Sequence, residues 1–451
     1  MGTLTDNTNL TTAADDLIQQ AARARADHAR TVPQRYARDI PAVDPLDWLA
    51  AAQAPDSFYW RSRDNQLELA GIGLADVEDL TANDAFASID ALSEKLNHAD
   101  SDCRYFGGLR FDPLLPPDKP VTDWTPFGLG RFVLPRWSLT RSHDRTTLAL
   151  NCRADETDFI NPFATTTPSS DMPEVSLVDR KDTPDFEGWQ KTINSALTEI
   201  GEDRCDKVVL ARRSELTLSN TISPWLVLRH LRERSHDVTL FALRVNGGPC
   251  FLGATPERLY YRHENALLSE AMAGTRPRGN TEAVDNALAR ELLASEKDIR
   301  EHAFVVNSLR SHLATVCSDI QVDAEPEIFR LARVQHLRTR VAGRLRRSII
   351  DGRLLSLVHP TPAVNGYPRS AALNLIRELE PFDRGWYAGP IGWIGPKNAE
   401  FAVAIRSAIL DRDALTLYAG AGIVEGSTAD REWAELEHKI ALYADIFENT
   451  P

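Results

Sequence analysis

Short runs of β-branched, aromatic and other apolar residues recur along this chain, with turn residues between them. This pattern is typical of β-strands. Early in the chain these runs follow one another directly, as in an antiparallel sheet: SFYWRS, LELAGIGLA, CRYFGGLRF, RFVLPRWSLT and TTLALNCR. Helical segments come between the later strands without a strict βαβ rhythm. We therefore predict a large mixed α/β (α+β) fold, with mainly antiparallel sheets and helices packed outside.

The chain has 451 residues, enough for one extended domain or for two lobes. Residues 1–155 are predicted to form a sheet-rich N-terminal portion that begins with a helix near residues 12–30. Residues 156–183 are rich in Thr, Ser, Pro and Asp and are predicted to be a connecting loop. Residues 184–451 form the remaining portion, which includes a long helical stretch over about 282–318 and a final helix over about 428–448.

Charge and composition exclude several classes of protein. The formal net charge is −14, whereas a general nucleic-acid-binding protein needs a basic face. The polar, acidic N-terminus is unlike a secretory signal, and no apolar run reaches the roughly 18 residues of a membrane helix. The five cysteines are scattered and form no CxxC pair, which argues against a disulfide scaffold or a thiolate zinc site. We expect a cytoplasmic protein that binds neither nucleic acid nor membrane.

Two predicted helices each carry a pair of carboxylates three residues apart. Asp298 and Glu301 lie in SEKDIREH, and Glu432 and Glu435 lie in DREWAELEHK. This spacing puts both members of a pair on one helical face. Two such faces opposite each other would offer oxygen ligands to a hard cation such as Mg²⁺. The alternative is a pair of solvated faces, with Glu435 in an i, i+4 ion pair with Lys439.

Lys207 and Glu257 are candidates for proton transfer. Lys207 lies inside a predicted apolar strand, DKVVLAR, and burial would lower the pKa of its ammonium group. Glu257 follows a Thr-Pro turn beside apolar residues, and burial would raise the pKa of its carboxyl group. The alternatives are a lysine on an edge strand that faces water, and an ion pair of Glu257 with Arg258 or with another arginine.

A glycine-rich segment near the C-terminus, AGAGIVEG, follows a predicted strand. Its spacing does not match the dinucleotide-binding pattern G-x-G-x-x-G, because Gly426 comes one position too late after Gly422. The backbone N–H groups at Gly420 and Gly422 could still bind a carboxylate, although a plain tight turn explains the segment equally well. Arg406 lies in the apolar run FAVAIRSAIL and suits bidentate carboxylate binding or a structural ion pair.

A series of segments between about residues 186 and 447 resembles the chorismate-utilising enzymes, in the same order along the chain. The segments are KVVLAR, GATPERL, EAMAGTRPRG, SEKDIREH, VQHLRTRVAGRL, HPTPAVNG, GWYAGPIGW, AIRSA, AGAGIVEGS and EWAELEHK. Within this family, Lys207 and the stretch His359-Pro-Thr-Pro-Ala-Val364 resemble the isochorismate synthases. The first 150 residues resemble the family more loosely.

The resemblance implies the fold of the chorismate-utilising enzymes and assigns a role to each candidate residue. Lys207 would activate a water that attacks C2 of chorismate, and Glu257 would protonate the departing C4 hydroxyl. Glu301 and Glu435 would bind Mg²⁺ directly, with Asp298 and Glu432 nearby or acting through water. Substrate binding would fall to a further set of residues: Gly274, Thr275, Tyr387, Arg406, Gly420, Gly422 and Lys439.

Other functions remain open from the sequence. A salicylate synthase also has the lysine and goes on to eliminate pyruvate, but its sequence differs in the HPTPAV stretch. An anthranilate synthase-like enzyme would aminate chorismate and usually needs a glutaminase partner, which we do not expect here. A non-catalytic, carboxylate-rich metal-binding scaffold would not need both Lys207 and Glu257.

Overall fold

The computed structural model describes residues 3–24, 33–81, 84–97, 102–113, 123–153, 156, 159–163, 174–346 and 350–448. Its strands are β1 (Gln34–Ile40), β2 (Ser57–Arg61), β3 (Leu67–Asp79), β4 (Tyr105–Leu109), β5 (Gly130–Ser142), β6 (Arg145–Cys152), β7 (Leu177–Thr183), β8 (Lys207–Leu218), β9 (Thr239–Arg244), β10 (Cys250–Thr255), β11 (Arg258–His263), β12 (Ala266–Pro277), β13 (Cys317–Val322), β14 (Glu327–Arg330), β15 (Val334–Leu345), β16 (Gly366–Tyr367), β17 (Pro390–Ile394), β18 (Asn398–Val403), β19 (Ser407–Asp411) and β20 (Ala414–Ile423). Its α-helices are α1 (Thr3–Ala24), α2 (Pro45–Ala52), α3 (Ala85–Asn97), α4 (Phe186–Gly201), α5 (Pro224–Arg234), α6 (Glu282–Ala294), α7 (Glu296–Ala314), α8 (Asp351–Val358), α9 (Arg369–Leu379) and α10 (Ala429–Glu448).

The strand pairs of the described residues are all antiparallel and join into one branched sheet. One series of neighbours leads from β7 through β8, β20, β19, β10, β9, β2 and β3 to β5. From β5 one branch continues through β6 to β1. The other branch runs through β4, β17, β18, β11 and β12 to β15, which also pairs with β13 and β14.

The sheet branches where β5 changes partner. Residues 130–133 of β5 pair with β4, and residues 137–142 pair with β6. Pro135 lies between these two segments, and a proline has no N–H to donate to a neighbouring strand. Its carbonyl instead accepts a hydrogen bond from the Asn151 side chain, at 2.8 Å. The proline therefore coincides with the point at which the sheet divides.

The mixed, mainly antiparallel fold class is confirmed. The N-terminal and C-terminal portions share hydrogen-bonded strand pairs, because β2 pairs with β9 and β4 with β17. The predicted connecting loop is wrong at its end, where Leu177–Thr183 forms β7 and pairs with β8. Most of β7 is charged and only partly buried, so its sequence lacks the apolar pattern that predicts a strand. Of the predicted N-terminal helix, residues 25–30 lie outside the described residues.

The long helical stretch predicted over 282–318 is two helices. Ser295 ends α6 and caps α7, since its side chain accepts a hydrogen bond from the backbone N–H of Asp298 at 3.3 Å. Serine is favoured at such a cap, which explains why the stretch breaks here. The break places Asp298 in the first turn of α7. The final helix, α10, agrees with its predicted range.

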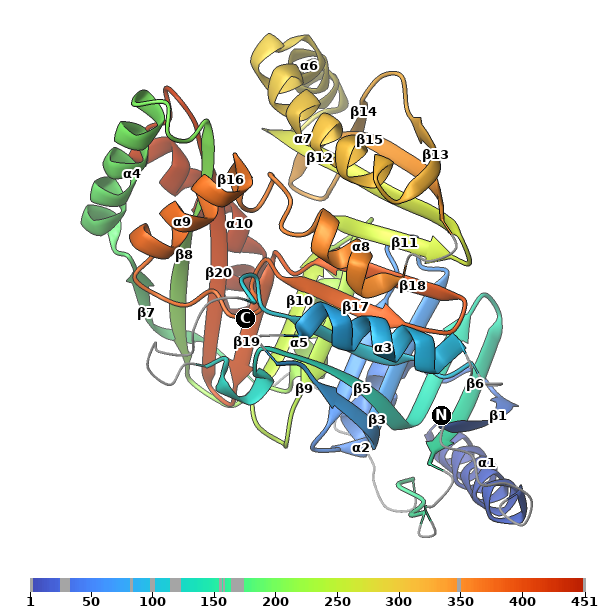
Figure 1. Cartoon of the computed structure of the whole chain (residues 1–451). Coiled ribbons are helices and arrows are strands. Elements are labelled where there is room, and N and C mark those ends of the chain that lie inside the picture. The colour runs from blue at the N-terminus through green and yellow to red at the C-terminus, as the bar shows by residue number, and fades with distance from the viewer. Residues whose placement is uncertain are drawn as a thin grey trace.

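The helices cover the outer faces of the sheet, as Figure 1 shows. Helices α6 and α7 pack on β12 and β15, whereas α10 packs on β20 and α9 on β8. Helices α3 and α8 pack against each other. In the described residues, no helix is long and apolar enough to cross a membrane.

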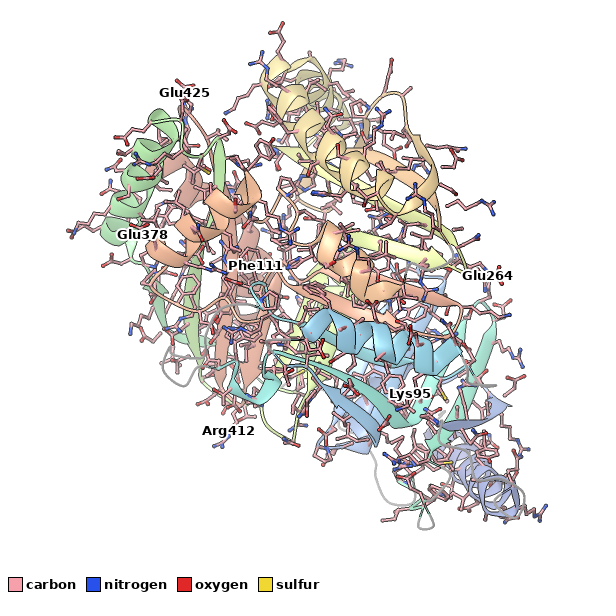
Figure 2. All side chains as sticks on the ribbon, viewed as in Figure 1. Lys95, Phe111, Glu264, Glu378, Arg412 and Glu425 are labelled. Atoms are coloured by element: carbon pink, nitrogen blue, oxygen red, sulfur yellow. The ribbon has the colours of Figure 1, made fainter. Side chains whose placement is uncertain are left out.

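Aromatic side chains fill the core beneath the sheets. Trp124, Phe251 and Trp386 are almost fully buried, and the Trp124 and Phe251 ring centroids lie 5.0 Å apart. Charged side chains such as Glu264 and Arg412 extend from the outside of the molecule (Figure 2). Each large ring buried in this way contributes about 1.5–3 kcal/mol to folding, so the core gives the site a rigid support.

Candidate active site

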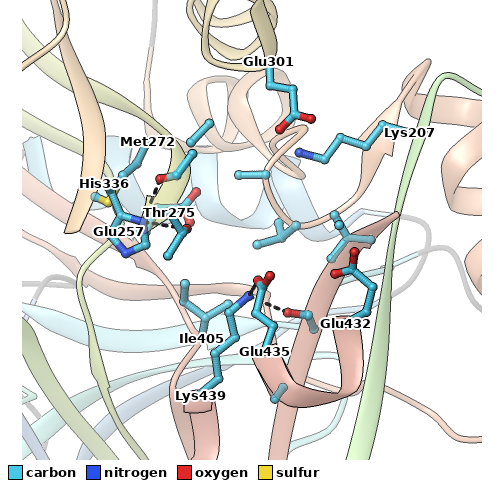
Figure 3. A pocket seen from close by; sticks show the side chains of 18 of the residues that line it. Lys207, Glu257, Met272, Thr275, Glu301, His336, Ile405, Glu432, Glu435 and Lys439 are labelled. Atoms are coloured by element: carbon cyan, nitrogen blue, oxygen red, sulfur yellow. Dashed lines mark hydrogen bonds and ion pairs between the residues drawn. The ribbon is translucent and has the colours of Figure 1, made fainter. Parts of the chain in front are cut away.

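A cavity of about 310 Å³ lies between α7 with β12 on one side and α10 with β8 and β20 on the other. Figure 3 shows the side chains that point into it. All the site residues predicted from the sequence line this cavity: Lys207, Glu257, Gly274, Thr275, Asp298, Glu301, Tyr387, Arg406, Gly420, Gly422, Glu432, Glu435 and Lys439. Residues from eight separate segments of the chain therefore meet at one place. Their individual roles stay predictions.

Lys207 points into the cavity from the start of β8 (Figure 3). The strand is paired on both sides here, with Ile423 of β20 opposite Val208 and Tyr367 of β16 opposite Lys207. The alternative of an edge-strand lysine that faces water is therefore wrong. Burial lowers the pKa of Lys207, a shift that the carboxylate of Glu301 partly opposes.

Two glycines of β20 make room for site side chains. A Cβ atom on Gly422 would lie 3.0 Å from Cε of Lys207. A Cβ atom on Gly420 would lie 3.0 Å from the hydroxyl oxygen of Tyr387 and 3.2 Å from Cγ1 of Val209. Such contacts are tighter than ordinary packing allows. The glycine-rich segment is thus more than a plain turn, because it lets Lys207 and Tyr387 approach the cavity.

Glu257 lies on the opposite side of the cavity, in the turn between β10 and β11. Its backbone N–H donates to the Thr255 hydroxyl at 3.2 Å, and its carbonyl accepts from the N–H of Val403 at 3.0 Å. The side chain accepts a hydrogen bond from the Thr361 hydroxyl at 3.2 Å. Burial raises the pKa of Glu257 to about 7, although this hydrogen bond and the charge of Lys207 act in the other direction.

The alternative partner of Glu257 is excluded. Arg258 pairs with Glu400 at 3.0 Å and approaches Glu270 at 3.7 Å. In the described part of the chain, no ion pair joins Glu257 to Arg258 or to any other arginine. The Glu257 carboxyl is thus buried without a direct cation contact, which is the environment in which a carboxylic acid keeps its proton near neutral pH.

The acidic pairs face the cavity from two helices. Asp298 and Glu301 come from α7, and Glu432 and Glu435 come from α10. Figure 3 shows Glu301 on one side of the cavity and Glu432 and Glu435 on the other. Burial raises the pKa of Glu432, and the neighbouring Glu435 raises it further. Closely placed carboxylates in a partly buried site are the kind of donor set that binds a hard divalent cation.

Two of these four carboxylates pair closely with cationic side chains. Asp298 accepts from Arg276 at 2.8 Å, and Glu435 pairs with Lys439 at 2.5 Å. The predicted i, i+4 ion pair therefore exists, but inside the cavity. Among the described residues, no three acidic, His or Cys side chains already converge as ligands. The donor set still fits a hard divalent cation in kind, since it supplies only oxygen atoms from two helices around one cavity.

Arg406 and Lys439 supply positive charge to the cavity. Arg406 was predicted inside an apolar strand; this is wrong, because it lies in the connection between β18 and β19 with φ of 51°. No carboxylate of the described residues lies within ion-pair distance of its guanidinium group, which disfavours a structural ion pair. The Lys439 ammonium donates to the carbonyl of Gly420 at 2.8 Å as well as to Glu435.

Gly274 and Thr275 form one wall of the cavity at an irregularity in β12. The register with β15 shifts between Ala273 and Thr275, and Gly274 has φ of 75°, a conformation that glycine adopts without strain. Its carbonyl accepts a hydrogen bond from Nδ1 of His336 at 3.1 Å. The bulge turns the backbone of this segment towards Asp298.

His336 and Thr361 line or support the site and were missed by the sequence analysis. His336 also lies 3.0 Å from the Thr275 hydroxyl, and burial lowers its pKa to about 4, so it is neutral at pH 7. Because a carbonyl can only accept, the Nδ1 proton faces Gly274 and Nε2 is free to accept. Both residues lie in segments that carried the resemblance, VQHLRTRVAGRL and HPTPAVNG, and this was the available signal.

The fold and the cavity define an enzyme class, and comparison with known proteins agrees. The family model described as "Chorismate binding enzyme" matches residues 17–447. The chain therefore belongs to the chorismate-binding enzyme family.

Within the family, the similar proteins include isochorismate synthases. Isochorismate synthase MenF of Escherichia coli is 32% identical, with 96% of this chain and 97% of the relative covered. MenF of Bacillus subtilis is also 32% identical, with 90% and 91% covered. The chloroplastic isochorismate synthase of Catharanthus roseus is 35% identical, with 85% and 68% covered.

Solved structures support the same fold. The structure of the menaquinone-specific isochorismate synthase MenF from E. coli aligns with a TM-score of 0.81 at 29% identity, covering 96% of this chain and 99% of that chain. Anthranilate synthase component I from Streptococcus pneumoniae aligns with a TM-score of 0.67 at 21% identity, covering 92% of each chain. The second likeness bears on the fold alone.

Proposed function

We propose that this chain is an isochorismate synthase, which converts chorismate to isochorismate. The isochorismate synthases among its relatives support this activity over the salicylate and anthranilate alternatives. The observation that carries the proposed chemistry is that Lys207 and Glu257 line one cavity, with pKa values that burial shifts in opposite directions. Such a pair can remove and deliver protons near neutral pH.

In the proposed reaction, Lys207 takes a proton from a water molecule as its oxygen bonds to C2 of the ring. The ring double bonds shift, and the C4–O bond breaks while Glu257 gives its proton to the departing hydroxyl. Water is a weak nucleophile and hydroxide a poor leaving group, so both proton transfers are needed. Each typically contributes roughly 10²–10⁴-fold. One water is consumed and one released, so the reaction is an isomerisation.

The lowered pKa of Lys207 matters because only a neutral amine can accept the proton. Glu257 has to be protonated before the C–O bond breaks. At its pKa of about 7, about half of the molecules meet that condition at pH 7. Thr361 holds the Glu257 carboxyl in a fixed orientation through its hydrogen bond.

We further propose Mg²⁺ as the cofactor, with Glu301 and Glu435 as direct ligands and Asp298 and Glu432 nearby or acting through water. The bound ion would neutralise the ring carboxylate of chorismate and fix the ring in the cavity. The contacts of Asp298 with Arg276 and of Glu435 with Lys439 each use one carboxylate oxygen, which leaves the second oxygen of each carboxylate for the ion or its water.

The other substrate carboxylate would be bound by Arg406 and Tyr387, with Lys439 and the backbone at Gly420 and Gly422. Arg406 can do this because the described residues leave its guanidinium group without a carboxylate partner. The whole chain has a net charge of −14, which repels a dianion. Attraction must therefore come from these local cations and from the metal.

Analysis of the products of the purified protein with chorismate, with and without Mg²⁺, tests the proposal. We expect isochorismate as the single product and a strong dependence on Mg²⁺. Salicylate with pyruvate would support a salicylate synthase instead, and anthranilate formed only with ammonia would support the aminating alternative. A carboxylate-rich scaffold would form no product, and alanine at Lys207 or Glu257 would then change nothing but stability.

A further inference from the structure

Arg212 is the last residue of the KVVLAR segment, and it has no part in the reaction proposed above. It lies on β8, the strand that begins with Lys207, but it does not line the cavity. Its side chain is fully buried, with 0% of its surface exposed. A buried guanidinium group is costly unless its charge is compensated, so its surroundings need an explanation.

The Arg212 side chain packs against α10. Its Nη1 lies 2.7 Å from a carboxylate oxygen of Glu437, and its guanidinium carbon lies 4.2 Å from the centre of the Trp433 ring. Asp182 of β7 is 3.5 Å from Nε on the other side. Arg180 also pairs with Glu437, at 2.5 Å. None of the guanidinium nitrogens of Arg212 has hydrogen-bond geometry to a described residue, so its contact with Glu437 is an ion pair by distance. The stacking on Trp433 does depend on the orientation of the planar guanidinium group.

Helix α10 has two faces that matter here. One carries the residues that Arg212 contacts, and the other carries the acidic residues of the site. Successive helical residues are about 100° apart. Glu432, Glu435 and Lys439 therefore fall within an arc of about 60°, and Trp433 and Glu437 fall within about 40°. The centres of the two arcs are about 150° apart. A helix held by one of these faces must present the other to the cavity.

We propose that Arg212 is a positioning residue that fixes the rotation of α10 about its axis, so that Glu432 and Glu435 face the cavity. This inference rests on the proposed function, because it is the proposed metal that uses these carboxylates. Apolar packing alone would tolerate a small rotation of the helix. A buried arginine that both pairs with Glu437 and stacks on Trp433 sets the rotation angle of α10. Residues that support metal ligands without binding the ion commonly have such an orienting role.

The test measures Mn²⁺ binding without chorismate, from the electron paramagnetic resonance signal of the free ion. Arg212→Met keeps the length of the side chain but removes its charge and plane, and Glu437 retains Arg180. We expect Arg212→Met to weaken Mn²⁺ binding about 10-fold or more, as is typical for residues behind metal ligands. Arg213→Met is the matched control, because Arg213 is the next residue of β8 and pairs with Glu215 instead. It should bind Mn²⁺ as the wild type does.

A second variant keeps the test decisive if Arg212→Met does not fold. Glu437→Gln preserves the size of the helix residue and removes the charge that Arg212 pairs with, and it should also weaken Mn²⁺ binding. Where both single variants fold, the double variant should bind Mn²⁺ no more weakly than the weaker of the two single variants. The reason is that each single change already removes the same interaction, the pair between Arg212 and Glu437. Wild-type affinity in the folded Arg212 or Glu437 variant would overturn the inference alone. Absence of Mn²⁺ binding by the wild type would overturn the proposed metal site as well.

Discussion

Replacing Glu257 by glutamine should lower activity and raise stability at the same time. The change keeps the size of the side chain but removes the proposed proton donor. Loss of a general acid typically costs roughly 10²–10⁴-fold, so we expect kcat to fall by that factor. The fall of kcat/KM as the pH rises through about 7, where wild-type Glu257 loses its proton, should disappear in the variant.

The stability change follows from the same pKa. Folding moves the pKa of Glu257 from 4.5 to about 7, because burial disfavours the charged carboxylate. The folded state thus holds this proton more tightly than the unfolded state, and the contribution to stability is full below pH 4.5 and is lost as the pH rises through 7. At pH 8 the charged form costs about 3 kcal/mol. Glu257→Gln avoids that cost, because an amide carries no charge. The net gain in stability is smaller by the amount that the amide loses in hydrogen bonding.

Denaturant unfolding at pH 5 and pH 8 measures the effect, together with pH profiles of kcat/KM. The variant should gain stability relative to the wild type at pH 8 and little at pH 5. Thr361→Val is the companion variant: it removes a hydrogen bond that favours the charged form, so it should move the descending limb to higher pH without abolishing it. Two results would refute the assignment of Glu257 as the proton donor with a raised pKa. One is an equal stability difference between variant and wild type at both pH values, and the other is an unchanged fall of kcat/KM with rising pH in Glu257→Gln.

Three further changes probe the rest of the site. Lys207→Ala should lower kcat roughly 10²–10⁴-fold and remove the rise of kcat with pH that comes from deprotonation of the amine, whereas a profile that keeps its rising limb would exclude Lys207 as the base. Gly422→Ala puts a methyl group 3.0 Å from Cε of Lys207 and should cost up to about 10²-fold in kcat, and Gly201→Ala, whose added Cβ meets nothing within 4 Å, should have full activity. Glu301→Gln and Glu435→Gln should each raise the Mg²⁺ concentration needed for half-maximal activity by about 10-fold or more, and an unchanged Mg²⁺ titration in both would exclude them as ligands.

Local periodicity made much of the site predictable. The i, i+3 spacing of the acidic residues depends only on helix geometry, so the sequence was enough to place each pair on one face. The order of the motifs along the chain, through the family resemblance, then predicts that α7, α10 and β8 contribute to one site. The added information from the structure is the environment: only three-dimensional packing gives Glu257 a pKa near 7.

The ion-pair partners of the charged side chains were not predictable from the sequence, because they depend on contacts between distant segments. Arg258 pairs with Glu400, 142 residues away, although Glu257 is its neighbour in sequence. Arg406 lies in an apolar run that reads as one strand, but the chain turns there and exposes the guanidinium group to the cavity. Apolar pattern shows which residues are buried, and it does not show where a buried strand ends.

The strand that carries Lys207 illustrates why such distant contacts matter for function. On one side, β8 is paired with β20 along most of its length, but on the other side β16 reaches only Val208, and β7 begins at Arg213. A buried ion pair from the segment after α9 fills this interval. Glu380 accepts from the N–H of Ala211 at 2.8 Å, and Arg384 donates to the carbonyl of Val209 at 2.7 Å.

These side chains therefore complete the hydrogen bonds that a neighbouring strand would otherwise make. Glu380 and Arg384 also pair with each other at 2.5 Å, with 3% and 4% of their side chains exposed. Removing either partner of such a buried pair typically costs about 3–5 kcal/mol, because it leaves an uncompensated charge. Because no strand of the described residues pairs with this side of β8 between β16 and β7, Val364 of the cavity wall can approach β8 there. The Glu380–Arg384 pair bonds the backbone groups of β8 that lack a strand partner, and Arg384 also donates to the carbonyl of Val364. The backbone of the strand that carries Lys207 is thus satisfied by the side chains of Glu380 and Arg384, which lie 169 and 175 residues beyond the groups they bond.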